Sequence, residues 1–388
     1  IQGVSTYYYL KKIGYNPIFL NYVSVKTENS LEESYKKSVQ TKAHIDFVNS
    51  YIENQTENLY NSDDVIAAID KYHIDAIIIG SDAVVQHHPL LSRIHRGRRK
   101  PFYISHPAPE RMFPNPFWGC GFDDKIPTVM MSVSSQNSKY SQFSKSLKSR
   151  MFKTLNNMKY ISVRDTWTLN MMKAIGVNHD VKVTPDPVFA FNYNAGHLVP
   201  SEDDIRKRFS LPKDYVLVSL HSQSLTLKTL DELNSMFKAV GKTCVAFPMP
   251  GGVRYQHHFD YEIKVPLSSI DWYALIKYAS GYVGSNMHPI IVSLHNAVPC
   301  FSIDHWGTKD FFNRTVRDGS SKVEHIMGVF GLKNYVKPID NDICYVEASV
   351  IVDAIQKFPC KHVRKVALDK YDEYLKMMGE IMNKITTK

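Results

Sequence analysis

The fold is decided by residues 271–303, DWYALIKYASGYVGSNMHPIIVSLHNAVPCFSI. Long amphipathic segments alternate here with short apolar ones, which predicts a helix, a strand, a helix and a strand at 271–279, 282–283, 288–294 and 300–303. This alternation is the repeating unit of a parallel sheet covered by helices. Ligands bind such sheets at the carboxyl ends of the strands, so the short segment between Gly284 and His288 is a candidate site.

The same alternation extends in both directions from this segment. Upstream we expect helices at 61–72, 141–157 and 166–175 and strands at 74–79, 128–133, 160–163 and 181–184. After a polar stretch at 192–200 the pattern restarts. It predicts two Rossmann-like α/β domains facing each other across a cleft, at 1–191 and 192–365, and a C-terminal helix at 366–388 that crosses back to the first domain. The chain opens in a helix, Tyr7–Ile13, so we expect a first strand and turn to be missing ahead of it.

Composition limits the kinds of protein to consider. A length of 388 residues suits two domains, and 22% charged residues exclude a disordered chain. The net charge of +9 favours anionic partners. The five cysteines form no CxxC pair, which argues against a disulfide framework or a Cys-rich zinc site and indicates a reducing, cytoplasmic compartment. We predict no metal and no cofactor.

Residues 86–127 interrupt the α/β pattern. They combine basic residues, among them Arg93 and Arg96, with aromatic residues such as Phe102, Phe117 and Trp118. A connection this long is expected to be a functional loop or an interaction surface. A membrane surface or a lipid-linked sugar explains this mixture at least as well as nucleic acid, for which no recognition motif is present.

Two strand ends carry the strongest candidate side chains. Arg164 follows the strand at 160–163 and offers a planar fork for a carboxylate or phosphate, while Asp165 can cap the next helix. A surface Arg–Asp pair is an equally good interpretation from spacing alone. His288 begins a helix and can exchange protons near neutral pH. A histidine that simply caps this helix is the competing interpretation, and we favour the functional one.

Two further strand ends are weaker candidates. Gly80, Ser81 and Asp82 follow an apolar run and could hold sugar hydroxyls, or form an ordinary turn. Ser320, Ser321 and Lys322 could form a phosphate nest, although a plain turn is favoured by spacing.

Taken in order and spacing, five segments resemble the polysaccharide pyruvyl transferase family: IIIGSD (77–82), YISVRDTWT (160–168), TPDPVFAF (184–191), 271–299 and SSK (320–322). The resemblance covers about residues 1–330. It implies a fold similar to GT-B glycosyltransferases. It also implies transfer of a pyruvyl group from phosphoenolpyruvate (PEP) to two hydroxyls of a sugar, giving a cyclic ketal and phosphate.

The resemblance also implies roles for individual residues. Arg164 matches an arginine expected to bind PEP, and His288 matches a histidine expected to donate a proton or hold PEP. Ser285, Asn286, Ser320, Ser321 and Lys322 would complete the PEP site, and Gly80, Ser81 and Asp82 the acceptor side. Many relatives have arginine where this chain has Asn286, so Lys322 or Arg314 would have to supply the missing charge.

The implied protein modifies a precursor of a surface polysaccharide, in the cytoplasm or peripherally at the inner face of the membrane, with 93–122 touching the acceptor or the membrane. Whether the acceptor is lipid-linked stays open. A GT-B glycosyltransferase using a nucleotide sugar is the alternative, and a carbohydrate-binding module without catalysis is a third. We expect Arg164→Ala to stay folded, because a strand-end arginine contributes little to a core.

Overall fold

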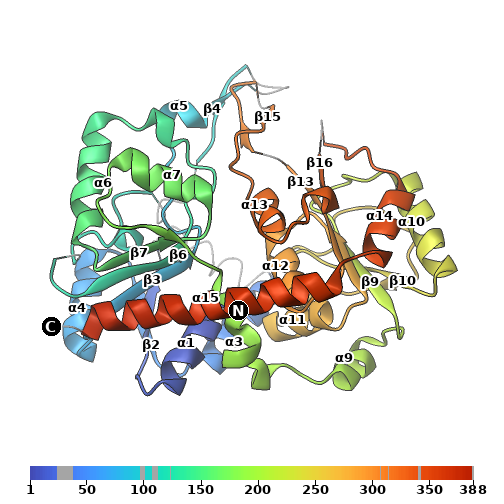
Figure 1. The fold of residues 1–388 in the computed structure, drawn as a ribbon, viewed down its shortest axis with the longest axis horizontal. Coiled ribbons are helices and arrows are strands. Elements are labelled where there is room, and N and C mark those ends of the chain that lie inside the picture. Colours follow the sequence, from blue (N-terminus) through green and yellow to red (C-terminus); the bar gives the residue numbers. More distant parts are fainter. Residues whose placement is uncertain are drawn as a thin grey trace.

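A computed structural model describes residues 1–23, 38–96, 101–106, 112–122, 124–305, 307–312, 314–339 and 342–386. Two sheets form two lobes (Figure 1), with strand orders β3-β6-β7-β8 and β11-β10-β9-β12-β13-β16. The paired strands of both sheets run parallel. The prediction of two Rossmann-like lobes is therefore confirmed.

The N-terminal lobe alternates strands and helices along the chain. Its central strand β6 is buried along its whole length, because helices cover both faces of the sheet. The elements are β3 (Ile77–Asp82), β6 (Thr128–Val133), β7 (Tyr160–Val163), β8 (Lys182–Val183), α4 (Ser62–Tyr72), α6 (Lys145–Asn157) and α7 (Thr166–Ile175). Before them come α1 (Gln2–Lys12), α3 (Val39–Tyr51) and a separate parallel pair, β1 (Phe19–Tyr22) and β2 (Gln55–Leu59).

The C-terminal lobe repeats the design around β9 (Tyr215–Ser219) and β12 (Gly281–Gly284), both completely buried. Its other strands are β10 (Thr243–Ala246), β11 (Tyr261–Glu262), β13 (Cys300–Asp304) and β16 (Val336–Pro338). Its helices are α9 (Glu202–Phe209), α10 (Leu227–Ala239), α11 (Ser269–Lys277), α12 (Met287–His295), α13 (Lys322–Val329) and α14 (Ala348–Gln356). The helix–strand–helix–strand prediction for 271–303 is confirmed within two residues at each boundary.

Helix α15 (Cys360–Thr386) runs along both lobes (Figure 1). Its first half packs in the core of the C-terminal lobe through Val363 and Ala367. Its second half packs through Tyr374, Met377 and three neighbours against strands β6 and β7 of the N-terminal lobe. The helix therefore crosses back as expected, and its methionines are packing surface. Among the described residues, no helix has the length and apolarity needed to span a bilayer.

Several predicted boundaries were wrong. Helix α15 begins at Cys360 rather than at 366, and α1 begins at Gln2. Strand β3 continues through Asp82, because Asp82 still pairs with Val133 of β6. The stretch 192–200 is not a free linker, because Asn194 is buried and its amide donates to Ser5 Oγ and Tyr374 Oη. The sequence SLEE at 30–33, a pattern typical of a helix N-terminus, lies outside the described residues.

The interruption at 86–127 is only partly an interaction surface. Phe113, Trp118 and Phe122 are buried in the core of the N-terminal lobe. The exposed part is a hairpin of β4 (Ile94–His95) and β5 (Tyr103–Ile104). It meets a hairpin from the other lobe, β14 (Thr308–Lys309) and β15 (Thr315–Val316), through Arg96 N–H, which donates to Phe311 O at 2.7 Å. Figure 1 shows β4 and β15 close together at the top of the molecule.

Candidate functional site: a charged cluster beside a neutral pocket

Arg164 lies at the carboxyl end of β7, and its side chain is almost fully buried. Its guanidinium donates to Asp186 at 2.6 Å through Nη1 and to Asp82 at 3.5 Å through Nη2. Burial alone would lower the pKa of Arg164, but the two carboxylates outweigh it, so the net shift is upward. The predicted cap is confirmed, since Asp165 accepts a hydrogen bond from Thr168 N at 2.7 Å. Arg164 is thus a fixed cation at the inner edge of the N-terminal sheet.

The expectation that Arg164 contributes little to the core was wrong. Asp186 is 2% exposed, and Arg164 Nη1 is its nearest cationic partner. Removing one member of such a pair leaves an uncompensated buried charge, which costs about 3–5 kcal/mol of stability. Arg164 therefore has a structural role in addition to any functional one.

His288 lies in the first turn of α12, on the opposite lobe. Asn286 caps this helix by accepting a hydrogen bond from His288 N at 3.3 Å. The ring is open to solvent, yet the protein around it desolvates it and lowers its pKa. The charge of Asp82 acts in the opposite direction, and that of Arg164 lowers the pKa further. His288 is therefore neutral at pH 7 in the free protein. It lies close enough to Asp82 and Arg164 of one lobe and Lys322 of the other for their charges to shift its pKa.

The segment 320–322 supplies one cation. Ser321 caps α13 by accepting from Glu324 N, and its hydroxyl donates to Asp304 at 3.0 Å. The hydroxyl of Ser320 donates to Asp318 at 2.6 Å. Both hydroxyls thus have acidic acceptors within the protein, and Lys322 is the member of the segment that shares a narrow cavity with Arg164.

The two basic side chains considered as substitutes at position 286 lie in different places. Lys322 is near enough to Asp82 and His288 to lower the pKa of both. Arg314 lies on the β14–β15 hairpin, is largely exposed and pairs with Asp310, Nε to Oδ2, at 2.9 Å. Lys322 is therefore the better placed of the two.

Together Asp82, Arg164, Asp186, His288 and Lys322 form what we name the charged cluster. Burial alone would raise the pKa of Asp82, but Arg164, His288 and Lys322 outweigh it, so the pKa falls and the carboxylate is ionised at neutral pH. Among the described residues, Arg164 Nε is buried without a protein partner. Buried polar atoms are normally satisfied, so a bound anion or water is the expected partner.

Two serine hydroxyls, one at a strand end of each lobe, are also buried without a hydrogen-bond partner among the described residues. Ser81 Oγ in β3 and Ser285 Oγ after β12 are buried and have no partner within the described part of the chain. Ser81 precedes Asp82, and Ser285 precedes the cap residue Asn286. The strand ends of both lobes therefore present unsatisfied hydrogen-bonding groups next to the charged cluster.

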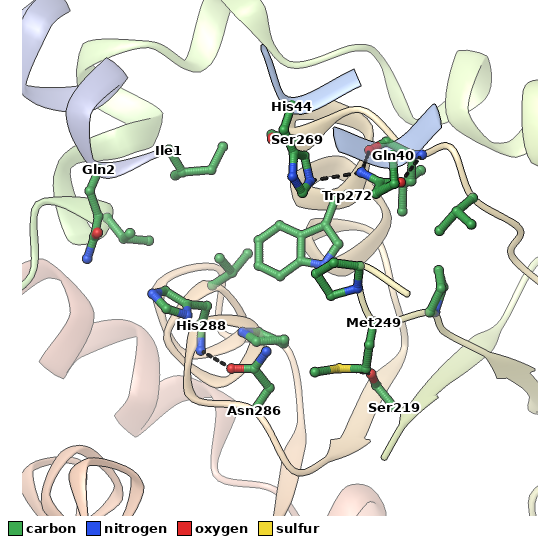
Figure 2. A pocket seen from close by; sticks show the side chains of 17 residues that line it. Ile1, Gln2, Gln40, His44, Ser219, Met249, Ser269, Trp272, Asn286 and His288 are labelled. Atoms are coloured by element: carbon green, nitrogen blue, oxygen red, sulfur yellow. Dashed lines mark hydrogen bonds between the residues drawn. The ribbon is translucent and has the colours of Figure 1, made fainter. Parts of the chain in front are cut away.

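On the other side of His288 lies a cavity of about 280 Å³, which we name the neutral pocket. Figure 2 shows its labelled side chains, with the indole of Trp272 between His288 and His44. Its lining comes from the strand ends of the C-terminal lobe and from α1 and α3, and among the described residues it includes no Asp, Glu, Lys or Arg. The lining residues are Ile1, Gln2, Gln40, His44, Val188, Ser219, Pro248, Met249, Pro250, Val265, Leu267, Ser269, Trp272, Asn286, His288, Pro289 and Val292.

Sequence reasoning missed three residues of the site. Asp186 lies in the quoted segment TPDPVFAF, and the signal was an acidic residue just after a strand. Gln2 donates to Asp186 at 2.5 Å, and Trp272 lies in the neutral pocket; neither stands out in the sequence. In the described residues, no group of three or more His, Cys, Asp or Glu side chains could hold a metal ion.

The fold is that of a two-lobed α/β protein of the GT-B type, with a cluster of basic and acidic side chains between the lobes. The sequence profile of the family described as "Polysaccharide pyruvyl transferase" matches residues 1–307. The chain therefore belongs to the polysaccharide pyruvyl transferase family, a family of transferases.

Solved structures support the fold. One is the UDP-GlcNAc 2-epimerase from Neisseria meningitidis bound to UDP-GlcNAc, with TM-score 0.53, 10% identity, and 99% of this chain and 96% of that chain covered. Another is the UDP-N-acetylglucosamine 2-epimerase from Rickettsia bellii, with TM-score 0.50, 10% identity, and coverage of 99% and 94%. At this identity the likeness concerns the fold alone. Among curated proteins, no match was found.

Proposed function

We propose that the protein transfers the pyruvyl group of PEP to two hydroxyls of a sugar in a surface polysaccharide precursor, forming a cyclic ketal and releasing phosphate. The observation that carries the proposal is the convergence of Arg164, Lys322 and His288, from both lobes, at one interdomain site. A carboxylate and a phosphate on a three-carbon unit need this combination of cations and a proton donor. No cofactor or metal enters the proposed chemistry.

PEP would bind the donors that Arg164 does not use within the protein. Asp186 and Asp82 each accept from one N–H of Nη1 and Nη2, so each Nη keeps a second N–H, and the buried Nε has no protein partner among the described residues. Lys322 would add a second positive charge from the other lobe. Because the two carboxylates fix the guanidinium, little side-chain entropy is lost when PEP binds.

The reaction would begin with a proton placed on the methylene carbon of PEP, C3. His288 is neutral in the free protein, but an adjacent trianion raises the pKa of an imidazole and favours its protonated form. The resulting cationic C2 accepts the first sugar hydroxyl, which loses its proton. The C2–O bond to phosphate then breaks, and the second hydroxyl bonds to C2 and loses its proton.

The reacting hydroxyls of the acceptor would lie next to Gly80, Ser81 and Asp82, at the end of β3. The Asp82 carboxylate is ionised and close to His288, so it can take up a hydroxyl proton. These assignments rest on the same interdomain site as the PEP assignment.

The test is to incubate the protein with PEP and a panel of glycosides. We expect release of phosphate together with a sugar whose mass gain equals pyruvate less one water. Thermal stabilisation by PEP, and not by nucleoside diphosphates, should accompany it. No phosphate release with any acceptor, combined with consumption of a nucleotide sugar, would reject the proposal in favour of a glycosyltransferase.

We further propose that the protein works in the cytoplasm at the inner face of an anionic membrane, on a lipid-linked acceptor. The two hairpins that meet through the Arg96–Phe311 hydrogen bond expose Phe102, Phe311 and Phe312, with Arg314 5.1 Å from the ring of Phe312. Exposed aromatic rings beside basic side chains suit an anionic lipid interface. Phe102→Ser/Phe312→Ser should lose co-sedimentation with phosphatidylglycerol vesicles. Leu368→Ser on α15, also an exposed apolar residue, should not.

A further inference from the structure

The neutral pocket differs from the charged cluster in chemistry. Its polar groups are amides, hydroxyls and imidazoles, and among the described residues its lining includes no Asp, Glu, Lys or Arg. A phosphate or carboxylate would therefore find no arginine or lysine in this described lining. An uncharged ligand with many hydroxyls would find both hydrogen-bond partners and an apolar wall.

We propose that the neutral pocket binds the sugar ring of the acceptor, with the indole of Trp272 as the platform under the ring; this rests on the proposed pyruvyl transfer. Trp272 is partly exposed, and its back packs on Phe247 at 6.4 Å between ring centroids. Supported in this way, the indole leaves one face open to the cavity (Figure 2). The C–H face of a pyranose is apolar and covers such a ring well.

Hydrogen bonds hold two side chains of the pocket, Gln40 and His44, in one conformation. Gln40 joins α3 to the C-terminal lobe by donating to Leu267 O at 2.8 Å and accepting from Leu267 N at 2.7 Å. Its amide nitrogen is also 2.8 Å from His44 Nε2. Burial lowers the pKa of His44, so the ring is neutral and accepts at Nε2, which leaves its proton on Nδ1. Both side chains are held before any ligand binds.

The volume and position of the pocket suit one sugar. A cavity of about 280 Å³ lies near the lower end of the ~300–1,000 Å³ typical of small-molecule sites, which fits a monosaccharide better than an oligosaccharide. His288 lines this pocket and also belongs to the charged cluster. A sugar on Trp272 would therefore have its hydroxyls on the His288 side, next to PEP.

The experiment is saturation-transfer NMR with a panel of methyl β-pyranosides of glucose, galactose, mannose and N-acetylglucosamine. We expect transfer to the ring C–H protons of at least one of them. In Trp272→Leu the dissociation constant should rise at least about tenfold, which corresponds to about 1.4 kcal/mol. Trp272→Phe, which keeps a smaller platform, should recover part of the affinity. Stabilisation by PEP should not change in either variant.

The outcomes separate this inference from the proposed function. If no methyl pyranoside binds, or if binding survives Trp272→Leu in a protein with an unchanged melting temperature, the pocket assignment is wrong. If Trp272-dependent sugar binding is found while PEP neither stabilises the protein nor releases phosphate, the pocket stands and the pyruvyl-transfer proposal fails. If Trp272→Leu also removes PEP stabilisation, the indole serves the whole site and the assignment to the sugar alone is rejected.

Discussion

The charged cluster and the neutral pocket lie on either side of His288 and are built in opposite ways. The cluster draws Asp82, Arg164 and Asp186 from the N-terminal lobe and Lys322 from the other. Arg164 and Lys322 lower the pKa of Asp82, and Asp186 and Asp82 raise the pKa of Arg164. The neutral pocket is lined largely by the C-terminal lobe and, within the part of the chain that the structure describes, holds no Asp, Glu, Lys or Arg. One site is organised by electrostatics and the other by shape and hydrogen bonding.

The difference shows how one fold can separate two substrates. The first turn of α12 contributes Met287 to the cavity of Arg164 and His288 to the neutral pocket. The proposed donor, with several negative charges, would be confined to one side of this turn, since burial of unpaired charge on the neutral side is costly. A sugar has no such restriction, so shape must position it. The two regions should therefore respond to different substitutions.

The largest expected effect comes from Arg164→Lys. Lysine keeps the charge that Asp186 needs but loses the planar fork and the Nε donor. We expect kcat/KM for PEP to fall by roughly 10³-fold, in the range for loss of a preorganised donor. The free energy of unfolding should fall by only about 1–2 kcal/mol. Steady-state kinetics and urea unfolding measure the two effects.

Arg206→Lys is the matched control, because Arg206 pairs with Glu202 on the surface helix α9. It should leave the PEP kinetics unchanged. If Arg164→Lys retains nearly full activity, the cluster is a structural ion pair and the contrast between the two regions loses its functional meaning.

The sequence predicted the strand ends better than it predicted what they contact. Alternation of helix and strand placed Arg164 and His288 at strand ends, because each strand is short, apolar and followed by a helix cap. It could not show that Arg164 is buried between two carboxylates, because Asp82 comes from another strand of the sheet and Asp186 caps the short 3-10 helix Pro187–Ala190 after β8. Burial of an ion pair depends on tertiary packing and not on local periodicity.

The neutral pocket was beyond sequence reasoning for the same physical reason. Trp272 belongs to an amphipathic pattern in which an indole normally means core, and Gln40 is more than 200 residues from its partner Leu267. The resemblance to a family supplied the chemistry of the cluster but no residue of the Trp272 platform. The predicted acceptor residues, Gly80 to Asp82, are the last three residues of β3, a strand that the sequence ended three residues too early.

Lys322→Ala should have the second-largest effect. Lys322 adds a positive charge near Asp82 and His288, and its loss should raise KM for PEP by about 30- to 100-fold, as for a charged hydrogen bond of about 2–3 kcal/mol. Sugar binding in the neutral pocket should not change. Arg314→Ala is the control, because this exposed arginine pairs with Asp310 away from the cluster. An equal effect of both substitutions would show that PEP responds only to overall charge.

The pH dependence should report the position of His288 between the two regions. Desolvation holds its pKa below 6.5 in the free protein, so its protonated fraction falls about tenfold per pH unit above neutrality. If His288 donates the proton, kcat/KM for PEP should rise as the pH is lowered from 8 to 6. Bound PEP raises the pKa of His288, so kcat, which reports the complex, should fall at a higher pH than kcat/KM does.

His288→Asn separates this effect from the ionisation of PEP itself, which is the same for both proteins. In that variant most of the activity should be lost. The pH profile of kcat/KM should also lose the rise between pH 8 and 6 that protonation of His288 causes. A wild-type profile identical in shape to that of His288→Asn would mean that the histidine holds PEP without transferring a proton.

The smallest effect should come from Gln2→Leu, which tests whether the two regions are independent. Gln2 lines the neutral pocket, yet its amide donates to Asp186 in the charged cluster. Asp186 accepts a hydrogen bond from Arg164 and holds its guanidinium in place, so we expect KM for PEP to rise about threefold. The free energy of unfolding should fall by about 1–2 kcal/mol.

The control is Gln223→Leu, the same substitution on a loop of the C-terminal lobe, which also removes an amide. Binding of the methyl pyranosides should change less than binding of PEP, because the Gln2 side-chain nitrogen already donates to Asp186. A large loss of both PEP and sugar binding would mean that this hydrogen bond couples the two regions into one site, and that their separation by charge is not a functional division.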